Sequence, residues 1–345
     1  MESAIPRHLS LPRTQPPRAE PGWQPPYPSF VARFKPSVTR VVMAYFGAQY
    51  RAGGETVPGA VRAARAELAA ACAHADGPGR VDHATYVDES GYTTLLTIGY
   101  WTDPERYDRW FGGAHASWLG EQRRGSGAGF FVEAVRPSVS RFETLVSNDR
   151  REGVAVLADA LSGEVAEHAY WGGARDRLPA AQTDPLLPGE PPTVVADAGR
   201  QRVRGQRNLC LIRSGQDWTD TDGDERRRYL DDIEPVLRAG LDFLRDDGPA
   251  VGCYANRYLR VVDTEGNPVD KSFGMSWWRS LADLDRWARD HPTHKAIFGE
   301  AMRYLSELGS AARLRLYHEV TVAAAEEQHF EYLGCHPATG MLRAL

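Results

Sequence analysis

Three histidines in the stretch 291–320 are the side chains of this chain best suited to bind a metal or to move protons. Pro292 fits the first position of a helix, where its missing N–H would be unpaired anyway. This spacing predicts that His291 is the N-cap and that His294 lies in the first turn. His318 lies on the apolar face of an alternating strand pattern. Imidazole is both a common metal ligand and a general acid or base near neutral pH.

The spacing leaves several interpretations of His294 open. With His291 it forms an i, i+3 pair that could bind one metal ion, although no glutamate follows as in an HExxH motif. Alone, it could be an axial ligand of haem, which needs one protein ligand and leaves the opposite face open. A helix N-terminus disfavours imidazolium and keeps such a ligand neutral. A capping or surface role for His294, and a core role for His318, are the plainer alternatives.

Two further polar residues stand where a pocket could use them. Ser214 ends a predicted strand and shares its face with Cys210 and Ile212, although a serine there is often only a turn residue. Arg177 lies in the segment GGARDRLP, and its plainer alternative is a solvated surface arginine. No Gly-x-Ser-x-Gly motif is present, which argues against a serine hydrolase. No Walker or Rossmann glycine pattern follows a predicted strand.

The composition is that of a globular protein without features of nucleic-acid or membrane binding. The chain has 345 residues, of which 42% are hydrophobic and 25% charged, and its net charge is −5. It has no basic run for nucleic acid, no apolar segment near the ~20 residues of a membrane span, and no secretory signal. The four cysteines are scattered and form no CxxC pair, which predicts free thiols in a reducing cytoplasm.

Apolar periodicity predicts the elements that must position these residues. In the first half we expect a strand at 41–46, a helix at 58–75, a hairpin at 82–88 and 92–101, a helix from 103 to about 112, a second helical piece carrying His115, and strands at 129–135 and 138–145. In the second half we expect a strand at 208–214, a helix at 224–246 kinked at Pro235, a hairpin at 252–262 and 271–278, helices at 281–290 and 292–308, and a strand at 314–320.

The two halves repeat this order and share a short motif. An Asp-Arg-Trp triplet occurs at 108–110 and at 285–287, a constant offset of 177, and each triplet ends nine residues after a tryptophan that closes a predicted strand. The βαββαβ order is that of a ferredoxin-like unit. We therefore expect an α+β fold of two ferredoxin-like units, with antiparallel sheets facing each other, helices outside, and room for a pocket between a sheet and its helices.

The chain divides accordingly into four predicted parts. These are an extended, proline-rich N-terminal arm at 1–35, a first ferredoxin-like unit with extra elements at 36–182, a linker at 183–205, and a second unit at 206–345. Trp23, Tyr27 and Phe30 could anchor the arm to its own domain or to a partner subunit, and a disordered tail is the alternative. The second unit carries three histidines where the first has only His115, so we expect the site in the second unit.

Six segments resemble those of the haem-containing aldoxime dehydratases, the group that acts on aliphatic aldoximes and phenylacetaldoxime. They are EHAYWGGARDRLP, RSGQDW, DFLRDDGPAVGCYANRY, HPTHKAIF, LRLYHEV and CHPATGMLR, and the resemblance covers nearly the whole chain. It implies a dimeric α+β barrel of two ferredoxin-like units, related to haem peroxidases and chlorite dismutases. It also implies a homodimer, a b-type haem, and a lyase that converts an aldoxime, R–CH=N–OH, to a nitrile and water.

The resemblance also implies a role for each candidate residue. His294 corresponds to the proximal haem ligand, His318 to the distal acid–base residue, Ser214 to the hydroxyl that holds the substrate oxygen, Arg177 to the distal arginine, and Glu143 to a supporting carboxylate. The implied mechanism binds the oxime nitrogen directly to ferrous haem, while His318 protonates the leaving hydroxide. A haem peroxidase of the same fold and a haem-binding or sensing protein without turnover are the alternatives.

Overall fold

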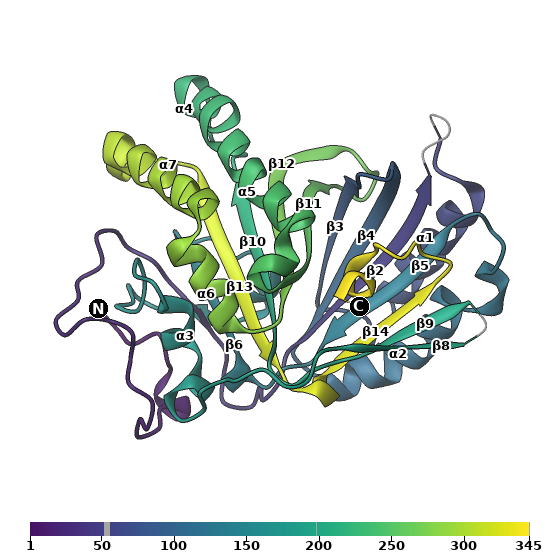
Figure 1. The fold of residues 1–345 in the computed structure, drawn as a ribbon, viewed down its shortest axis with the longest axis horizontal. Coiled ribbons are helices and arrows are strands. Elements are labelled where there is room, and N and C mark those ends of the chain that lie inside the picture. Colours follow the sequence, from purple (N-terminus) through teal and green to yellow (C-terminus); the bar gives the residue numbers. More distant parts are fainter. Residues whose placement is uncertain (52–55, 198, 345) are drawn as a thin grey trace.

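The computed structural model describes residues 1–51, 56–197 and 199–344, and its two halves follow the same order of elements (Figure 1). The first half contains β2 (Val42–Arg51), α1 (Gly59–Cys72), β3 (Arg80–Val87), β4 (Tyr92–Trp101), α2 (Pro104–Trp118) and β5 (Gly129–Val135). The second contains β10 (Leu209–Asp217), α4 (Gly223–Arg228), α5 (Glu234–Asp246), β11 (Cys253–Val262), β12 (Pro268–Trp278), α6 (Leu281–Asp290), α7 (Pro292–Leu308) and β13 (Arg315–Ala323).

Shorter elements complete the chain. The remaining strands are β1 (Ala32–Arg33), β6 (Phe142–Val146), β7 (Ala160–Leu161), β8 (Thr193–Asp197), β9 (Arg200–Arg204) and β14 (Gln328–Leu333), and α3 spans Gly173–Arg177. Single 3-10 turns lie at Arg7–Leu9, Glu121–Arg123, Val139–Arg141, Gly153–Leu157, Pro179–Gln182, Gly248–Val251, Gly309–Ala311, Ala325–Glu327 and Gly340–Ala344, and a π-helical turn lies at Tyr229–Ile233.

The main sheet has twelve strands in the order β6-β13-β10-β12-β11-β3-β4-β2-β5-β14-β9-β8. Within each half the fourth strand pairs with the first, the first with the third, and the third with the second, which is the ferredoxin-like arrangement. A short ladder between β11 and β3, from Arg260↔Thr85 to Val262↔His83, joins the two halves. The expected α+β fold of two such units is confirmed.

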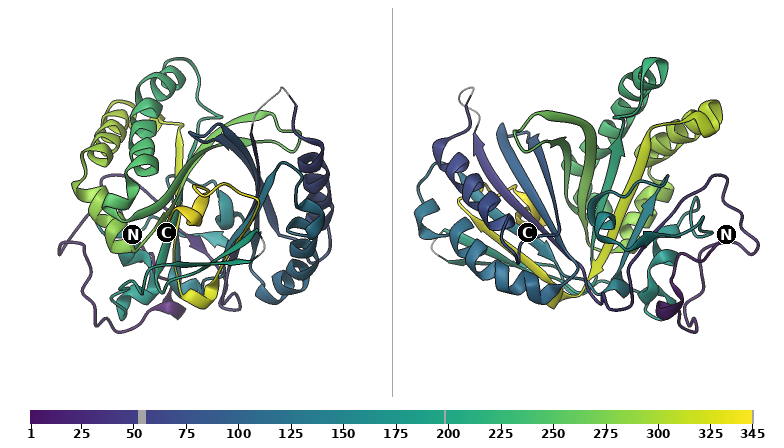
Figure 2. Two further views of the ribbon diagram at one scale, coloured as in Figure 1. Left: turned by 45° about the vertical axis from the view of Figure 1, so that its right-hand side comes forward. Right: turned by 180° about the vertical axis from the view of Figure 1, so that it is seen from behind.

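The two halves of the sheet curl toward each other, and their helices lie on opposite outer sides (Figure 2). The inner faces share one core, to which Met43 and Tyr45 of β2 and Phe273 and Met275 of β12 contribute. Helices α1 and α2 cover the outer face of the first half, and α5, α6 and α7 cover that of the second. The strands of the second half therefore present one face to the shared core and the other to α5–α7.

The N-terminal arm packs against its own chain. Trp23 donates its indole N–H to the carbonyl oxygen of His168 at 2.9 Å, and the backbone N–H of Arg18 donates to Asp176 Oδ2 at 2.6 Å. The backbone of Thr14 bonds to that of Gln182 at 2.9 Å. The arm thus packs along residues 160–183, which carry α3.

Several elements differ from the sequence-based expectation. The helix expected to end near residue 112 continues through Gly112 and Gly113 as α2 to Trp118, because Trp110, Ala114 and Trp118 extend its buried face past them. The strand expected at 138–145 begins as a 3-10 turn and becomes extended only in β6. Strands β8 and β9 form a hairpin inside the range 183–205. The division of the chain at that range stays a prediction.

Two further features concern the helices and the cysteines. None of the described helices has the length and apolar character needed to cross a membrane. Cys72, Cys210, Cys253 and Cys335 are all free thiols, as their spacing predicts. Burial raises the pKa of the Cys72 thiol to about 12, so this thiol stays protonated and unreactive at neutral pH.

Candidate active site

A cavity lies between the outer face of the second half-sheet and the helices that cover it. The space free of protein atoms is about 1080 Å³, including the part that opens to solvent at its mouth. Its lining comes from β10, β12 and β13 on the sheet side, from α5, α6 and α7 on the helix side, and from residues 169–177 at one end. Such a space between a sheet and its helices is the place where the sequence predicted a pocket.

Strand register brings two of the candidate residues together on the sheet side. Ser214 of β10 lies directly opposite His318 of β13 and opposite Gly274 of β12, and all three line the cavity. Because residues directly opposite in an antiparallel pair have Cβ atoms about 5 Å apart, the Ser214 hydroxyl and the His318 ring are neighbours. Gly274 has no side chain, which lets Leu241 of α5 approach β12: a Cβ there would lie 3.0 Å from Leu241 Cδ2.

Arg177 and Glu143 join His318 at one end of the cavity. Arg177 donates Nε and Nη2 to the two carboxylate oxygens of Glu143 at 2.8 and 3.1 Å, a bidentate pair in which both side chains are buried. Arg177 Nη2 also lies 2.8 Å from His318 Nε2, which is 3.1 Å from Glu143 Oε1. The sequence predicted these three residues separately, and the fold places them in one hydrogen-bonded cluster.

Burial and charge oppose each other at Glu143. Burial alone would raise the pKa of this carboxyl group, but Arg177 and His318 outweigh it and lower the pKa below its ordinary value. Glu143 is therefore a carboxylate at neutral pH.

The segment that carries Arg177 turns at Gly172, whose φ of +94° favours glycine, and a Cβ at that position would meet the Arg18 side chain at 2.7 Å.

The two histidines at the start of α7 lie in different surroundings. His291 is the N-cap, as predicted: its Nδ1 accepts from the backbone N–H of Thr293, and its ring stacks on Phe243 with centroids 4.1 Å apart. His294 lines the cavity from the helix side instead. The interpretation of the two as an i, i+3 metal pair does not hold, because His291 is occupied as a cap and does not line the cavity.

The environment of His294 suits the axial ligand of a haem iron. Burial lowers its pKa to about 4, an effect that the nearby Ala288 carbonyl partly opposes, so the imidazole is neutral at pH 7. Its Nδ1 is buried and has no hydrogen-bond partner among the described residues. The rings of Trp287 and Trp171 flank it, with centroids 4.8 and 5.8 Å away. A neutral imidazole that lines a cavity, with its buried Nδ1 beside the Ala288 carbonyl, suits the axial ligand of a haem iron.

The rest of the lining is mostly apolar and suits a flat, apolar macrocycle. These side chains come from both walls, and they are Ile212, Leu237, Leu241, Leu244, Leu284, Ile297 and Val320. One carboxyl group faces the same space: burial raises the pKa of Asp285 to about 6. Asp285 belongs to the repeated Asp-Arg-Trp triplet, which in the sequence indicated only a repeat. The flanking Trp171 and Trp287 were not predicted as site residues either.

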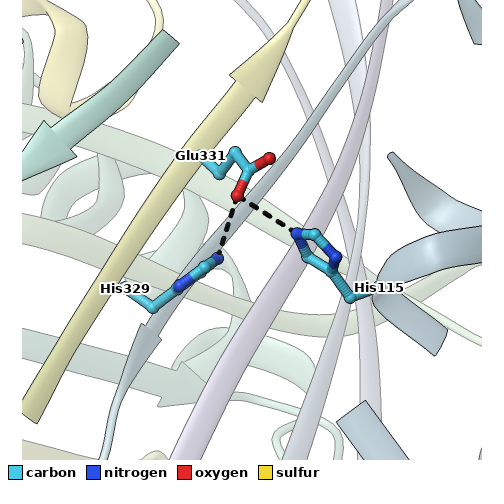
Figure 3. A group of neighbouring side chains, drawn as sticks. All are labelled: His115, His329 and Glu331. Carbon is cyan, nitrogen blue, oxygen red and sulfur yellow. Dashed lines mark hydrogen bonds and ion pairs between the residues drawn. The ribbon is translucent and has the colours of Figure 1, made fainter. Parts of the chain in front are cut away.

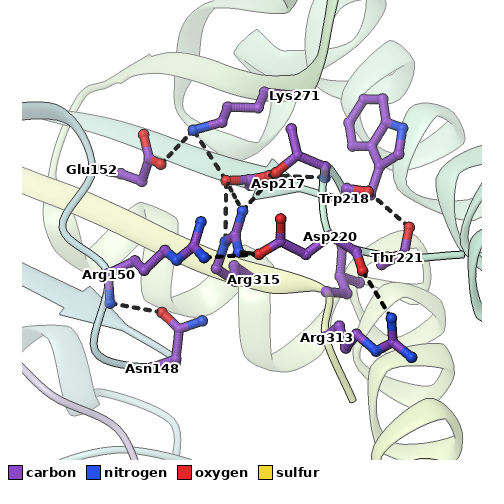
Figure 4. Close-up of polar contacts among 12 residues, drawn as sticks. Asn148, Arg150, Glu152, Asp217, Trp218, Asp220, Thr221, Lys271, Arg313 and Arg315 are labelled. Carbon is purple, nitrogen blue, oxygen red and sulfur yellow. Dashed lines mark hydrogen bonds and ion pairs between the residues drawn. The ribbon is translucent and has the colours of Figure 1, made fainter. Parts of the chain in front are cut away.

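A polar network fixes the strand ends beyond the cavity (Figure 4). Asp217, which ends β10, lies opposite Lys271 of β12 and Arg315 of β13, and it binds both, with Lys271 Nζ at 3.0 Å and Arg315 Nη2 at 2.7 Å. Burial would raise the pKa of Asp217, but bonds from Thr219, Arg315 and Lys271 prevail and lower it to about 2. These bonds hold β10 and β13 in the register that aligns Ser214 with His318.

Comparison with known proteins places the chain in a family. The family model described as haem-containing dehydratase matches residues 44–341. An aliphatic aldoxime dehydratase of Pseudomonas chlororaphis is 45% identical over 99% of this chain and 98% of its own length, and a phenylacetaldoxime dehydratase of a Bacillus species is 33% identical over 77% and 78%. A crystal structure of an aldoxime dehydratase in complex with butyraldoxime, 43% identical, superposes with a TM-score of 0.94 over 99% of this chain and 96% of that one. The chain belongs to the haem-containing dehydratases.

Proposed function

We propose that this protein is an aldoxime dehydratase, which converts R–CH=N–OH to R–C≡N and water. The observation that carries the proposal is the pairing of two opposed groups across one cavity. A neutral His294 faces it from the helices, and Ser214 and the His318–Arg177–Glu143 cluster face it from the sheet side. Family membership and the names of the full-length relatives point to the same reaction.

His294 would hold the haem, since it offers an uncharged imidazole, and the apolar side chains of α5 and α7 would contact the macrocycle. The chemistry that a ferrous b-type haem supplies there is electron donation to the oxime nitrogen, which weakens the N–O bond. The side chains of this protein must meet the other requirements of the reaction. A proton must reach the departing hydroxyl oxygen, a proton must leave the carbon, and bulk water must stay out.

His318 is the residue placed to donate the first proton and to accept the second. As imidazolium it would donate a proton to the oxime oxygen while the N–O bond breaks, because hydroxide is a poor leaving group and water is a good one. The resulting neutral imidazole would then take the carbon-bound proton as the C≡N bond forms. The two transfers return His318 to its starting state, and the reaction consumes no proton overall.

Arg177 and Glu143 would support both protonation states of His318. A guanidinium can only donate, so when Arg177 Nη2 bonds to His318 Nε2, that nitrogen accepts and the ring is neutral. When Nε2 carries a proton, it can donate to Glu143 Oε1, which lies 3.1 Å away. Because Nε2 is engaged by this pair, the proton exchanged with the oxime would be carried by Nδ1, while an Nε2–H held by Glu143 would stay in place through both transfers.

Ser214 would fix the direction of the oxime hydroxyl. Its position opposite His318 in the strand register lets its hydroxyl donate to the same oxygen that His318 protonates. The apolar side chains around them, including Ile212 and Val320, would receive the R group and keep water from the reacting atoms. Loss of the Ser214 hydroxyl should therefore slow the reaction while the cavity still binds haem and substrate.

The comparisons favour an aliphatic substrate, because the aliphatic aldoxime dehydratases share more identity with this chain than the phenylacetaldoxime enzyme does. We also propose that the protein works in the cytoplasm as a homodimer. The free thiols support a reducing compartment, and the resemblance of the whole chain to its family supports the dimer. Light scattering coupled to size exclusion measures the number of chains directly.

The function is tested by adding butyraldoxime to the purified, haem-loaded protein after anaerobic reduction. We expect the Soret band to shift on addition and butyronitrile to accumulate over many turnovers, with much slower formation by the ferric protein. A parallel sample receives hydrogen peroxide and an oxidisable dye. Dye oxidation without nitrile would identify a peroxidase, and a Soret shift without either product would identify a haem-binding protein.

A further inference from the structure

A second group of metal-binding side chains lies on the other half of the molecule, away from the cavity. His115 of α2 and His329 and Glu331 of β14 converge there (Figure 3). His115 Nε2 is 3.1 Å from Glu331 Oε2, and His329 Nε2 is 3.5 Å from the same oxygen. One ligand atom from each residue lies within 4.8 Å of the other two, the one such group found in the described part of the chain.

Two of the three separations are close to an edge of a tetrahedral coordination sphere, and the third is within 4.8 Å. Zinc binds imidazole nitrogen and carboxylate oxygen at about 2.0–2.2 Å, so neighbouring ligand atoms of a tetrahedral site lie about 3.3 Å apart. The two measured separations of 3.1 and 3.5 Å bracket that value. Three protein ligands of this kind leave a fourth position for water.

Two of the three groups place buried atoms at the centre of the cluster. His329 Nε2 is buried, has no hydrogen-bond partner among the described residues, and lies 3.5 Å from Glu331 Oε2. The Glu331 side chain is completely buried. This imidazole nitrogen is buried, has no hydrogen-bond partner in the described part of the chain and is directed at a buried carboxylate. Hydrogen bonding within the chain does not explain that arrangement.

The types of ligand restrict the kind of metal. A hard, oxygen-seeking ion such as Mg²⁺ or Ca²⁺ would find only one carboxylate here, whereas two imidazoles select a borderline ion such as Zn²⁺. Two arginines hold the carboxylate in place: Arg200 Nη1 lies 3.0 Å from Glu331 Oε1, and Arg202 Nε lies 3.1 Å from Oε2. Their charge opposes any divalent cation and should lower the affinity of the site.

We propose that His115, His329 and Glu331 form a zinc site that ties α2 to β14. The bound ion would replace the hydrogen-bonded proton between His115 and Glu331 and would satisfy His329 Nε2. Because β14 comes from the end of the chain and pairs with β5 of the first half, the site fastens a distant segment to the first unit. At the repeat offset, residue 115 corresponds to position 292, between the two histidines of α7, so both units would place a metal-binding imidazole in this region.

The test is equilibrium dialysis of the full-length, haem-loaded protein, free of any histidine tag, against zinc-buffered solutions. Zinc per chain is measured by mass spectrometry and haem by its pyridine haemochrome. We expect the wild type to bind one zinc ion per chain and to gain thermal stability on binding. His329→Ala and His115→Asn should each bind zinc at least about tenfold more weakly than the wild type, as expected for a lost contact at a metal site. Their haem content should be unchanged.

The matched control is His74→Ala, which removes an exposed histidine of the same unit outside the group. It should bind zinc as the wild type does. A wild type that retains no zinc would overturn the proposal. So would His329→Ala or His115→Asn proteins that bind zinc as tightly as the wild type, and the use of two independent variants keeps the test decisive if one of them folds poorly.

Discussion

Two histidines three residues apart on α7 lie in different surroundings, and these surroundings decide what each can do. The ring of His291 caps the helix and stacks on Phe243, while that of His294 lies between two tryptophans at the edge of a cavity. Their spacing alone predicted the cap and the first-turn position but could not separate a metal pair from a single ligand. That decision depends on α6 and on residues 169–177, which no local pattern relates to α7.

Exchanging each of these histidines separately tests the assignment. His294→Ala should lose haem during purification, because no other side chain is proposed to bind the iron. His291→Ala should keep haem and lose only about 1 kcal/mol of folding stability, as for a lost N-cap. Haem per chain and the midpoint of thermal unfolding give both results. A His294→Ala protein with full haem and an unchanged spectrum would refute the ligand assignment.

The hydroxyl of Ser214 can be tested against that of Ser276, a second serine that lines the same cavity. Ser214→Ala should reduce turnover about tenfold at unchanged haem content, the effect of one lost hydrogen bond to the reacting oxygen. Ser276→Ala removes a hydroxyl that is already bonded to Asn256, at 3.0 Å, and should leave turnover within about twofold. Initial rates of nitrile formation distinguish them, and equal rates in both variants would reject the role of Ser214.

At the scale of elements, the position of His294 depends on how closely α5 approaches α7. Gly240 of α5 makes this approach possible, since a Cβ there would lie 2.6 Å from Ile297 Cδ1 and 3.7 Å from Thr293 Cβ. Both contacts are on the turns that flank His294. A methyl group at position 240 would need only the end of the Ile297 side chain to move, but a large side chain there would have to displace α7 from the cavity.

Gly240→Leu should lower haem retention and thermal stability together, because the added side chain separates the two helices. Gly299→Leu is the control: a Cβ at Gly299 of α7 would have no other atom within 4 Å, so leucine there should raise helix stability and keep haem. Haem per chain after gel filtration is the measurement. Full haem in Gly240→Leu would show that the helix spacing does not position the ligand.

Elements with strong local signals were predictable, and those defined by distant partners were not. The bounds of α6 and α7 match the prediction, because Ser280 and Pro292 mark their starts and the apolar stripe is regular. The expected kink at Pro235 corresponds to a π-helical turn directly before it. Strand β14 was not predicted as an element, since it is stabilised by β5 and β9 rather than by its own sequence neighbours.

At the scale of the whole molecule, β13 links the cavity to the core between the sheets. His318 faces the helices, while the next residue, Glu319, faces inward, where Tyr100 donates to its Oε2 at 3.4 Å and the backbone N–H of Val154 donates to its Oε1. Burial raises the pKa of Glu319 to about 7, an effect that nearby Arg213 partly opposes. The shared core thus contains a carboxyl group whose protonation is coupled to folding.

This coupling has a definite sign. Because the folded-state pKa lies above the ordinary value of 4.5, the native protein holds a proton that the unfolded chain releases as the pH rises from about 4.5 to 7. Asp285, whose pKa is raised to about 6, contributes in both proteins, so the wild type should lose about 1–3 kcal/mol more stability across that window than Glu319→Gln does. Urea unfolding at pH 5 and pH 7.5 measures both. Parallel pH dependence of the two proteins would contradict the raised pKa.

The repeat explains how much of the global architecture could be predicted. Two Asp-Arg-Trp triplets at a fixed offset indicated two similar units, and their strand order confirms this. The sequence did not indicate that the N-terminal arm runs beside residues 160–183, because those contacts are backbone bonds and single side chains such as Trp23. Nor did it show that Arg177 and Glu143 form a buried pair, which depends on α3 folding back over β6.

The most direct test of the proposed site is the rate of nitrile formation from butyraldoxime by haem-loaded, anaerobically reduced His318→Ala, compared with the wild type at equal haem concentration. His318 is the residue proposed to protonate the departing hydroxyl and to deprotonate the carbon, so its loss should lower the rate about 10²-fold or more while the haem spectrum stays native. A variant that forms nitrile at a near-normal rate would contradict the account.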